Sequence, residues 1–326
     1  MRTPFSLLLV AIGIAAAGVV ARAQGVPGMQ SAPNWAYPVL PPDAAAAVDD
    51  GKPRSVPGGV RQYTLTQVAN FFDPPDWYDD HAPAVGIAGK GRPPEGYACG
   101  YCHLPIGWGK PENGRLAGLP VRYFMQQVAD FRSGARKSAI ADKLPHDWMM
   151  KAIRSFSDAD IEAAGKYFSS MAQPPATRTR VVETDTVPTT TVAGWILVPD
   201  GSNRKEPIGN RIIETAEDYS RTALRDPRAN YIAYVPMGAV KKGEALATTG
   251  GGKTLQCSIC HGPDLKGTGD IPRIAGISAI YSARQLFDFQ TGRRNGPGAQ
   301  LMKAAVANLT EEDVVSLASY LVSLAP

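Results

Sequence analysis

A pentapeptide of the form Cys-x-x-Cys-His occurs twice in this chain of 326 residues, at 99–103 and at 257–261. The two copies contain all four cysteines of the chain: Cys99, Cys102, Cys257 and Cys260. The spacing is typical of covalent c-type haem attachment, in which both thiols bond to the ring and the adjacent histidine ligates the iron. A redox cysteine pair or half of a zinc site requires no histidine directly after the second cysteine. The motifs therefore predict two haems c, with His103 and His261 as iron ligands.

The sequence that follows each motif is also duplicated, at an offset of 158 residues. Twelve residues after the motif histidine comes Arg-hydrophobe-Ala-Gly, which begins at Arg115 in the first copy and at Arg273 in the second. Further equivalent pairs are Tyr123 with Tyr281, Phe131 with Phe289, and Arg136 with Arg294. A duplication of this length predicts two similar domains, at 59–172 and 236–326.

Hydrophobic spacing indicates that both repeats are helical. Apolar residues recur at helical intervals in four segments: 63–72, 121–131, 238–248 and 280–289. Each repeat then closes on a further helix, for which Ser157 and Thr310 supply N-cap signatures followed by acidic residues. We therefore expect an all-α fold of two tandem domains joined by a long irregular segment.

Three segments lie outside the repeats. Residues 1–23 read as a secretory signal, with a basic start, an apolar run and a small-x-small cleavage site; an uncleaved membrane anchor is the alternative. Residues 24–58 are rich in proline and alanine and predict an extended, loosely packed N-terminal arm. Residues 173–235 predict a linker or insertion, in which a β-prone run at 187–198 indicates a small hairpin. The formal net charge of +4 does not indicate a nucleic-acid partner.

Methionines at matching places are candidates for the second axial ligand of each iron. Met302 lies seven residues before the residue that precedes the last helix cap, and Met149 holds the same place in the first repeat. By analogy with His/Met cytochromes, we assign Met149 and Met302 as ligands. Met150 and His146 remain alternatives at the first haem, whereas His81, in an acidic turn, is expected on the surface.

Taken together, these motifs resemble the bacterial tandem dihaem cytochromes c, which are built from two class I cytochrome c domains. In that family, the carbonyl of a proline after the motif orients the ligand histidine. Pro272 matches this proline, but Gly114 stands at the equivalent place in the first repeat. Leu104 likewise replaces the glycine that usually follows the motif. Arg115 and Arg273 are candidates for contacts with haem propionates, since a buried carboxylate needs a charged or hydrogen-bonding partner; the alternative is that each is a solvated arginine.

The resemblance implies an exported electron carrier in the periplasm that takes single electrons from one redox protein and passes them to another. Its expected partners are a membrane oxidoreductase, a terminal oxidase or a periplasmic dehydrogenase. Contact with the membrane is expected only if the signal is not cleaved. The alternatives are a dihaem enzyme, either a peroxidase or a protein like thiosulfate dehydrogenase, and the cytochrome subunit of a dehydrogenase complex.

Overall fold

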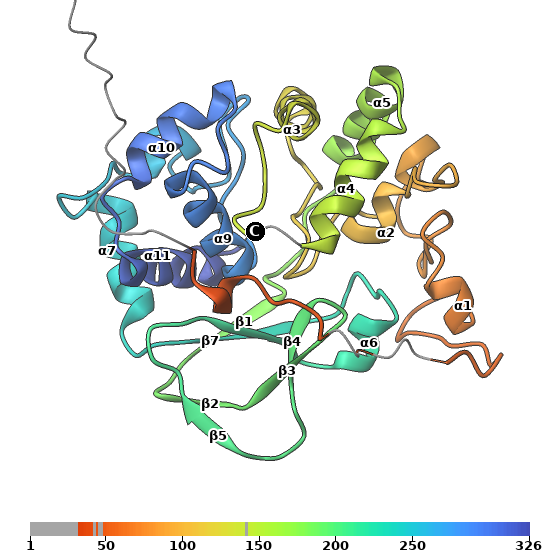
Figure 1. The fold of residues 1–326 in the computed structure, drawn as a ribbon, viewed down its shortest axis with the longest axis horizontal. Helices are drawn as coiled ribbons and strands as arrows, with labels where there is room; N and C mark the ends of the chain where they lie inside the picture. The colour runs from red at the N-terminus through yellow and green to blue at the C-terminus, as the bar shows by residue number, and fades with distance from the viewer. Residues whose placement is uncertain (1–31, 42–43, 45–47, 141–142) are drawn as a thin grey trace, which may run out of the picture.

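The computed structural model describes residues 32–41, 44, 48–140 and 143–326. The predicted signal at 1–23 and the first part of the predicted arm lie outside these residues. In the described part, two groups of helices lie side by side above a β-sheet, with the first repeat on the right and the second on the left in Figure 1. No helix among these residues is long and apolar enough to cross a membrane.

The first helical group comprises α1 (Leu65–Val68), a 3-10 turn (Gly86–Ala88), α2 (Cys99–His103), α3 (Val121–Ser133), α4 (Leu144–Arg154) and α5 (Asp158–Ser170). The predicted cap of α5 is confirmed, because the Ser157 hydroxyl accepts a hydrogen bond from the Asp160 amide. The Asp160 carboxylate accepts one from the Ser157 amide in return. This reciprocal pair satisfies amides that have no partner within the helix.

The helix predicted at 63–72 is shorter than expected. Helix α1 ends at Val68 because the chain then turns toward the haem motif. The Asn70 side chain accepts a hydrogen bond from the Phe72 amide, and the Phe71 carbonyl accepts one from the Ala98 amide at 2.9 Å. These contacts hold the segment after α1 against the residue that precedes Cys99.

The second helical group comprises α7 (Ala239–Thr249), α8 (Ser258–His261), α9 (Ala279–Gln290), a 3-10 turn (Pro297–Ala299), α10 (Gln300–Val306) and α11 (Glu311–Ser323). Thr310 caps α11 through the same reciprocal bonds, here with Asp313. Helices α7 and α11 cross so closely that a Cβ atom at Gly243 would lie 1.9 Å from the Ser316 carbonyl oxygen. Only glycine permits this contact between the two helices.

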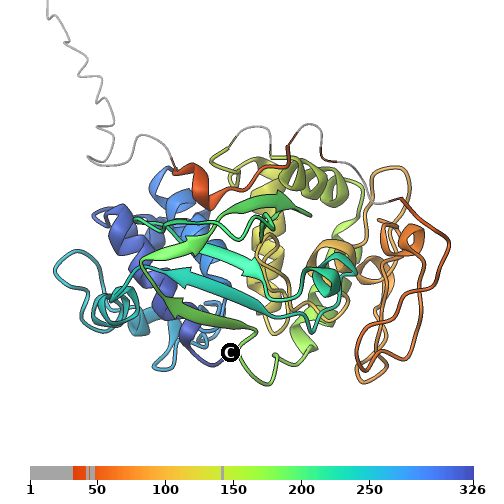
Figure 2. The same cartoon turned by 90° about the horizontal axis from the view of Figure 1, so that it is seen from below.

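The all-α prediction is wrong, because the segment between the repeats forms a mixed sheet. Its strands are β1 (Thr179–Glu183), β2 (Thr186–Pro188), β3 (Thr190–Ala193), β4 (Ile196–Pro199), β5 (Lys205–Pro207), β6 (Ile213–Ala216) and β7 (Tyr231–Val235). Five strands pair in the order β1-β7-β6-β4-β3, and β2 pairs with β5. Figure 2 shows this part of the chain from below, with its strands in green. Strands β1 and β7 are parallel although about fifty residues separate them in sequence, so local patterns revealed only the hairpin of β3 and β4. We call residues 179–235 the sheet module.

The sheet module contacts both helical groups. The buried Glu214 carboxylate on β6 accepts hydrogen bonds from Ser278 Oγ at 2.6 Å and from the Ile280 amide at 2.9 Å, at the start of α9. On the other side, Arg225, which follows the short helix α6 (Tyr219–Ala223), donates to the Tyr101 carbonyl in the first haem motif at 2.8 Å. The module therefore joins the two repeats as a structural element.

The expectation of a loosely packed N-terminal arm is wrong for its described residues near Tyr37. Ala36 and Tyr37 are buried within the core of the second group. The Tyr37 hydroxyl donates to Asp288 on α9 at 2.9 Å, and the Trp35 indole donates to Glu311 on α11 at 2.8 Å. These aromatic side chains bury large apolar surfaces while their polar atoms find partners.

Candidate functional site

Both haem motifs fold as a single helical turn, α2 in the first repeat and α8 in the second. None of the four cysteines forms a disulfide. Each turn ends in a left-handed residue, Leu104 with φ 68° and Gly262 with φ 83°. With ψ 151° as well, Leu104 lies in a region that costs a residue other than glycine about 1–3 kcal/mol, and burial of its side chain offsets part of that cost. The backbone of the motif is therefore the same in both repeats despite the missing glycine.

Each motif histidine has one ring nitrogen bound to a backbone carbonyl eleven residues later. His103 Nδ1 lies 2.7 Å from the Gly114 oxygen, and His261 Nδ1 lies 2.7 Å from the Pro272 oxygen. The contact survives without proline because it uses only the backbone. When Nδ1 donates, the Nε2 lone pair of each ring is available to a metal. Burial also lowers the pKa of both rings, to about 4 for His103, which favours this neutral form.

Gly114 replaces proline because a side chain from the other repeat occupies the adjacent space. A Cβ atom at Gly114 would lie 2.6 Å from the Tyr281 hydroxyl oxygen and 2.7 Å from its Cζ atom. Tyr281 belongs to α9, so the first histidine loop and the second repeat are in direct contact.

The candidate methionines lie on matching helices. Met149 and Met150, on α4, are half-buried against the same apolar cluster as Cys99. Met302, on α10, is half-buried against the cluster that also contacts Cys257. The structure thus brings a methionine and an attachment cysteine to one core in each repeat. His146 lies one turn before Met149 and packs against the Phe131 ring at 5.7 Å.

The two arginines that follow the motif histidines by twelve residues each have a buried nitrogen atom without a hydrogen-bond partner among the described residues. These atoms are Arg115 Nε and Arg273 Nη1. Burial, together with the charges of Arg178 and Arg273, lowers the pKa of Arg115 to about 9. Burial likewise lowers the pKa of Arg273. Buried guanidinium groups that repel one another require anionic partners. Haem propionates meet that requirement, so these residues fit the predicted cofactor.

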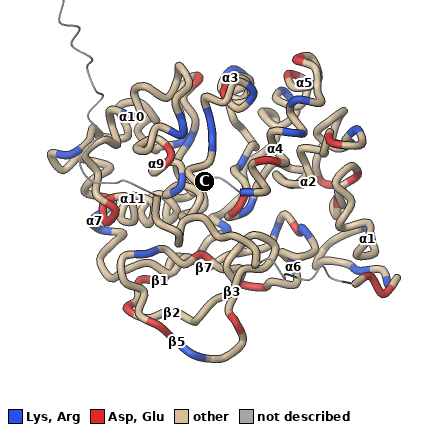
Figure 3. Tube along the Cα trace, in the orientation of Figure 1, with Lys and Arg blue, Asp and Glu red and all other residues tan. Residues whose placement is uncertain are grey.

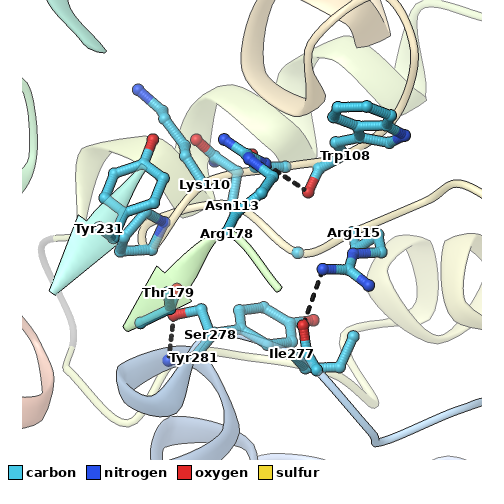
Figure 4. A pocket seen from close by; sticks show the side chains of 14 residues that line it. Trp108, Lys110, Asn113, Arg115, Arg178, Thr179, Tyr231, Ile277, Ser278 and Tyr281 are labelled. Carbon is cyan, nitrogen blue, oxygen red and sulfur yellow. Dashed lines mark hydrogen bonds between the residues drawn. The ribbon is translucent and has the colours of Figure 1, made fainter. Parts of the chain in front are cut away.

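Arg178 brings the sheet module to the first haem loop. It lies on the chain just before β1, is buried, and donates to the Trp108 carbonyl at 3.2 Å and the Gly109 carbonyl at 2.8 Å. In Figure 4, Arg115 and Arg178 approach the junction of the two repeats from different elements. The Gly109 amide in turn donates to the His103 carbonyl at 3.0 Å. Sequence reasoning missed Arg178, because its segment has no counterpart in the other repeat.

A second group of residues makes equivalent contacts in both directions between the two repeats, with approximate two-fold symmetry. Sequence reasoning assigned these residues no role. Arg136 donates to Tyr281 at 3.2 Å and to Gln285 at 2.8 Å. Its equivalent, Arg294, donates to Tyr123 at 3.2 Å and to Gln127 at 2.8 Å.

The backbones on either side of these arginines also pair in a symmetric way. The Lys137 amide donates to the Arg293 carbonyl at 2.8 Å, and the Asn295 amide donates to the Ala135 carbonyl at 2.7 Å. Figure 3 shows basic residues where the two helical groups meet. The repeated Gly-x-Arg was the sequence signal that could have located this interface.

His81 is not the surface residue that the sequence indicated. Its side chain is 11% exposed and lies between two acids, with Nε2 3.3 Å from Asp76 and Nδ1 3.6 Å from Asp80. The neighbouring Asp76 carboxylate raises the pKa of His81 against the effect of burial. It therefore stabilises a local ion pair away from the haem motifs.

Comparison with known proteins identifies the family. Residues 240–325 match the family described as cytochrome c. A cytochrome c-554(548) of Halomonas halodenitrificans is 35% identical over 75 residues, which cover 90% of that protein and 23% of this chain. The chain belongs to the c-type cytochromes. Its two attachment motifs and its longer relatives make it a tandem dihaem cytochrome of two class I domains, with two haems c as cofactors.

Two longer relatives cover most of this cytochrome. The thiosulfate dehydrogenase electron acceptor of Thiomonas intermedia is 28% identical over 74% of this chain and 83% of its own length. Cytochrome c4 of Azotobacter vinelandii is 26% identical over 75% of this chain and 91% of its own length. The solved structure of reduced cytochrome c4 from Pseudomonas stutzeri aligns with a TM-score of 0.45 and 24% identity, covering 69% of this chain and 93% of that one. The protein is an electron-transfer cytochrome that exchanges electrons with redox partner proteins.

Proposed function

We propose that both irons of this cytochrome have one histidine and one methionine ligand, His103 with Met149 and His261 with Met302. The observation that carries the proposal is the pair of 2.7 Å contacts between the histidine Nδ1 atoms and the backbone, which leave both Nε2 atoms available. The half-buried methionines on the same cores as the attachment cysteines support it. With both axial positions filled, neither iron offers a binding site to a substrate.

The haems supply reversible one-electron exchange between ferrous and ferric iron. The assigned histidines and methionines would hold the two irons, and the apolar cores around them would exclude water from the rings. The Arg136 and Arg294 bonds hold the two repeats in contact. Arg115 and Arg273 provide buried positive charge, which would stabilise haem propionates and favour the reduced iron. These features support passage of an electron from one repeat to the other.

We further propose the organisation that the sequence predicts: haem domains at 59–172 and 236–326, a removable signal at 1–23 and action in the periplasm. The relatives named as thiosulfate dehydrogenase electron acceptors support a dehydrogenase as the donor. A membrane oxidoreductase or a terminal oxidase would then receive the electrons.

The absorption spectrum of the oxidised holoprotein tests the ligand assignment. A methionine bound to ferric haem gives a weak charge-transfer band in the far red, and we expect its intensity to correspond to two haems. Met149→Ala should halve this band, whereas Met150→Ala, the matched control on the same helix, should leave it unchanged. The opposite result would assign Met150, and a band for one haem in the unmodified protein would favour His146. Binding of carbon monoxide by the reduced, unmodified protein would contradict the closed irons and favour an enzyme.

A further inference from the structure

Three equivalent positions of the two repeats differ sharply in their surroundings. The first position lies two residues before the first cysteine of the motif. The second position directly precedes the second cysteine, and the third directly precedes the assigned methionine. In the first repeat these are Tyr97, Tyr101 and Trp148; in the second they are Leu255, Ile259 and Leu301. All six side chains are large and apolar or aromatic, so both repeats can form the same kind of surface beside the haem.

In the first repeat, one aromatic ring fills the space between the three positions. The Phe71 ring centroid lies 4.9 Å from that of Tyr97, 4.1 Å from that of Tyr101 and 5.3 Å from that of Trp148. Contacts of this kind between aromatic rings add to the gain from burial. The three positions therefore surround a site the size of one aromatic side chain.

The sheet module covers the same surface from outside. The Arg225 guanidinium lies 3.4 Å from the centre of the Tyr101 ring, and the Trp195 ring lies 5.7 Å from the Trp148 ring. Tyr101 is consequently only 6% exposed. Trp195 adopts a left-handed backbone, with φ 68°, at the turn between β3 and β4. The first repeat thus closes this surface with its own chain.

In the second repeat, the equivalent surface is open. Leu255 is 63% exposed, Ile259 is 66% exposed and Leu301 is 78% exposed. Because the equivalent positions of the first repeat converge on one ring, we expect these three side chains to lie together. Contiguous apolar side chains at such exposure are typical of surfaces that another molecule covers. Ile259 directly precedes Cys260, so a molecule bound here lies beside the attached edge of the second haem.

We propose that Leu255, Ile259 and Leu301 form the docking surface for a redox partner protein, which inserts an aromatic side chain as Phe71 does in the first repeat. In the first repeat the equivalent surface binds the aromatic ring of Phe71, so we expect the exposed surface of the second repeat to bind an aromatic side chain as well. Electrons exchanged with this partner enter or leave at the second haem, while Phe71 and the sheet module close the corresponding face of the first. The inference rests on the proposed electron carriage and specifies where it occurs.

Voltammetry of the holoprotein on gold electrodes tests this proposal. A phenyl-terminated monolayer serves as the aromatic probe, and a hydroxyl-terminated monolayer as the comparison. Ile259→Ser and Leu255→Ser should each lower the electron-transfer rate on the phenyl surface about tenfold, the loss expected for a residue central to docking. Val60→Ser is the matched control, because Val60 is 60% exposed and belongs to the first repeat. Its rate should stay within about twofold of the unmodified protein.

Three outcomes would overturn the proposal or separate it from the proposed function. Unchanged rates for both serine variants would overturn it. So would a dimer of the unmodified protein in sedimentation velocity that Ile259→Ser converts to a monomer, since the occupant would then be a second copy. Reduction potentials and the far-red band of each variant show whether the haems are intact. If neither haem cycles on either electrode, the electron-carrier proposal itself fails, whereas a loss confined to the phenyl surface leaves it standing.

Discussion

Replacing Gly114 with alanine is expected to destabilise the contact between the two repeats. The added Cβ atom would lie 2.6 Å from the Tyr281 hydroxyl oxygen and 2.7 Å from Cζ, so the rigid ring must move. Forcing a methyl group into a packed site costs about 1–3 kcal/mol. Loss of the 3.2 Å bond between Arg136 and Tyr281 adds about 1 kcal/mol. The expected fall in the free energy of unfolding is therefore about 2–4 kcal/mol.

Urea unfolding of the holoprotein, followed by tryptophan fluorescence, measures this change. Pro272→Ala is the matched control, since it alters the equivalent position of the second repeat and keeps the carbonyl that accepts from His261. We expect it to cost less than about 1 kcal/mol.

A double-mutant cycle provides the decisive comparison. In a Tyr281→Ala background, Gly114→Ala no longer meets a ring, so most of its cost should vanish. An equal cost in both backgrounds, or a cost below about 0.5 kcal/mol in the unmodified protein, would refute the explanation for glycine at this position.

Three further perturbations follow from buried charge. Arg178→Leu leaves backbone carbonyls without a donor and should lower the free energy of unfolding in urea by about 2–4 kcal/mol. Arg180→Leu, at an exposed position two residues later on β1, should change it by less than about 0.5 kcal/mol. Although burial opposes ionisation of Asp313, bonds from Lys253 and from the helix cap lower its pKa to about 2. The contribution of Asp313 to stability is thus complete above the ordinary carboxyl pKa and lost as the pH falls toward 2. The Asp313→Asn variant should lack this part of the fall in thermal stability at acid pH. Asp76 raises the pKa of His81. The contribution of His81 to stability is therefore complete below about pH 6.5 and is lost as the pH rises through the raised pKa. A His81→Gln variant whose thermal stability still fell over that pH range would contradict this.

Much of the helical fold could be predicted because its signals are local. The helices at 121–131, 238–248 and 280–289 and the caps at Ser157 and Thr310 all appear where the spacing of side chains places them. The predicted length of the first helix was wrong because Phe71 accepts a hydrogen bond from a residue 27 positions later, and no local pattern reveals that contact.

The sheet was underestimated for a related reason. Its pairing of β1 with β7 joins strands about fifty residues apart in sequence, and each short strand gains stability only when its neighbours are present. The hairpin between β3 and β4 is the local exception, and it lies within the β-prone run.

The sequence by itself determined the cofactor and the duplication, because covalent attachment requires two thiols and a histidine at fixed spacing. Only the tertiary structure decided how the two copies differ. It showed that the backbone at Gly114 supplies the contact that Pro272 makes in the second repeat. It also showed that Phe71 and the sheet module cover Tyr101 in the first motif, while Ile259 at the equivalent position of the second motif is exposed. Burial and contact between distant residues depend on how the whole chain packs, which the spacing of residues within one repeat does not specify.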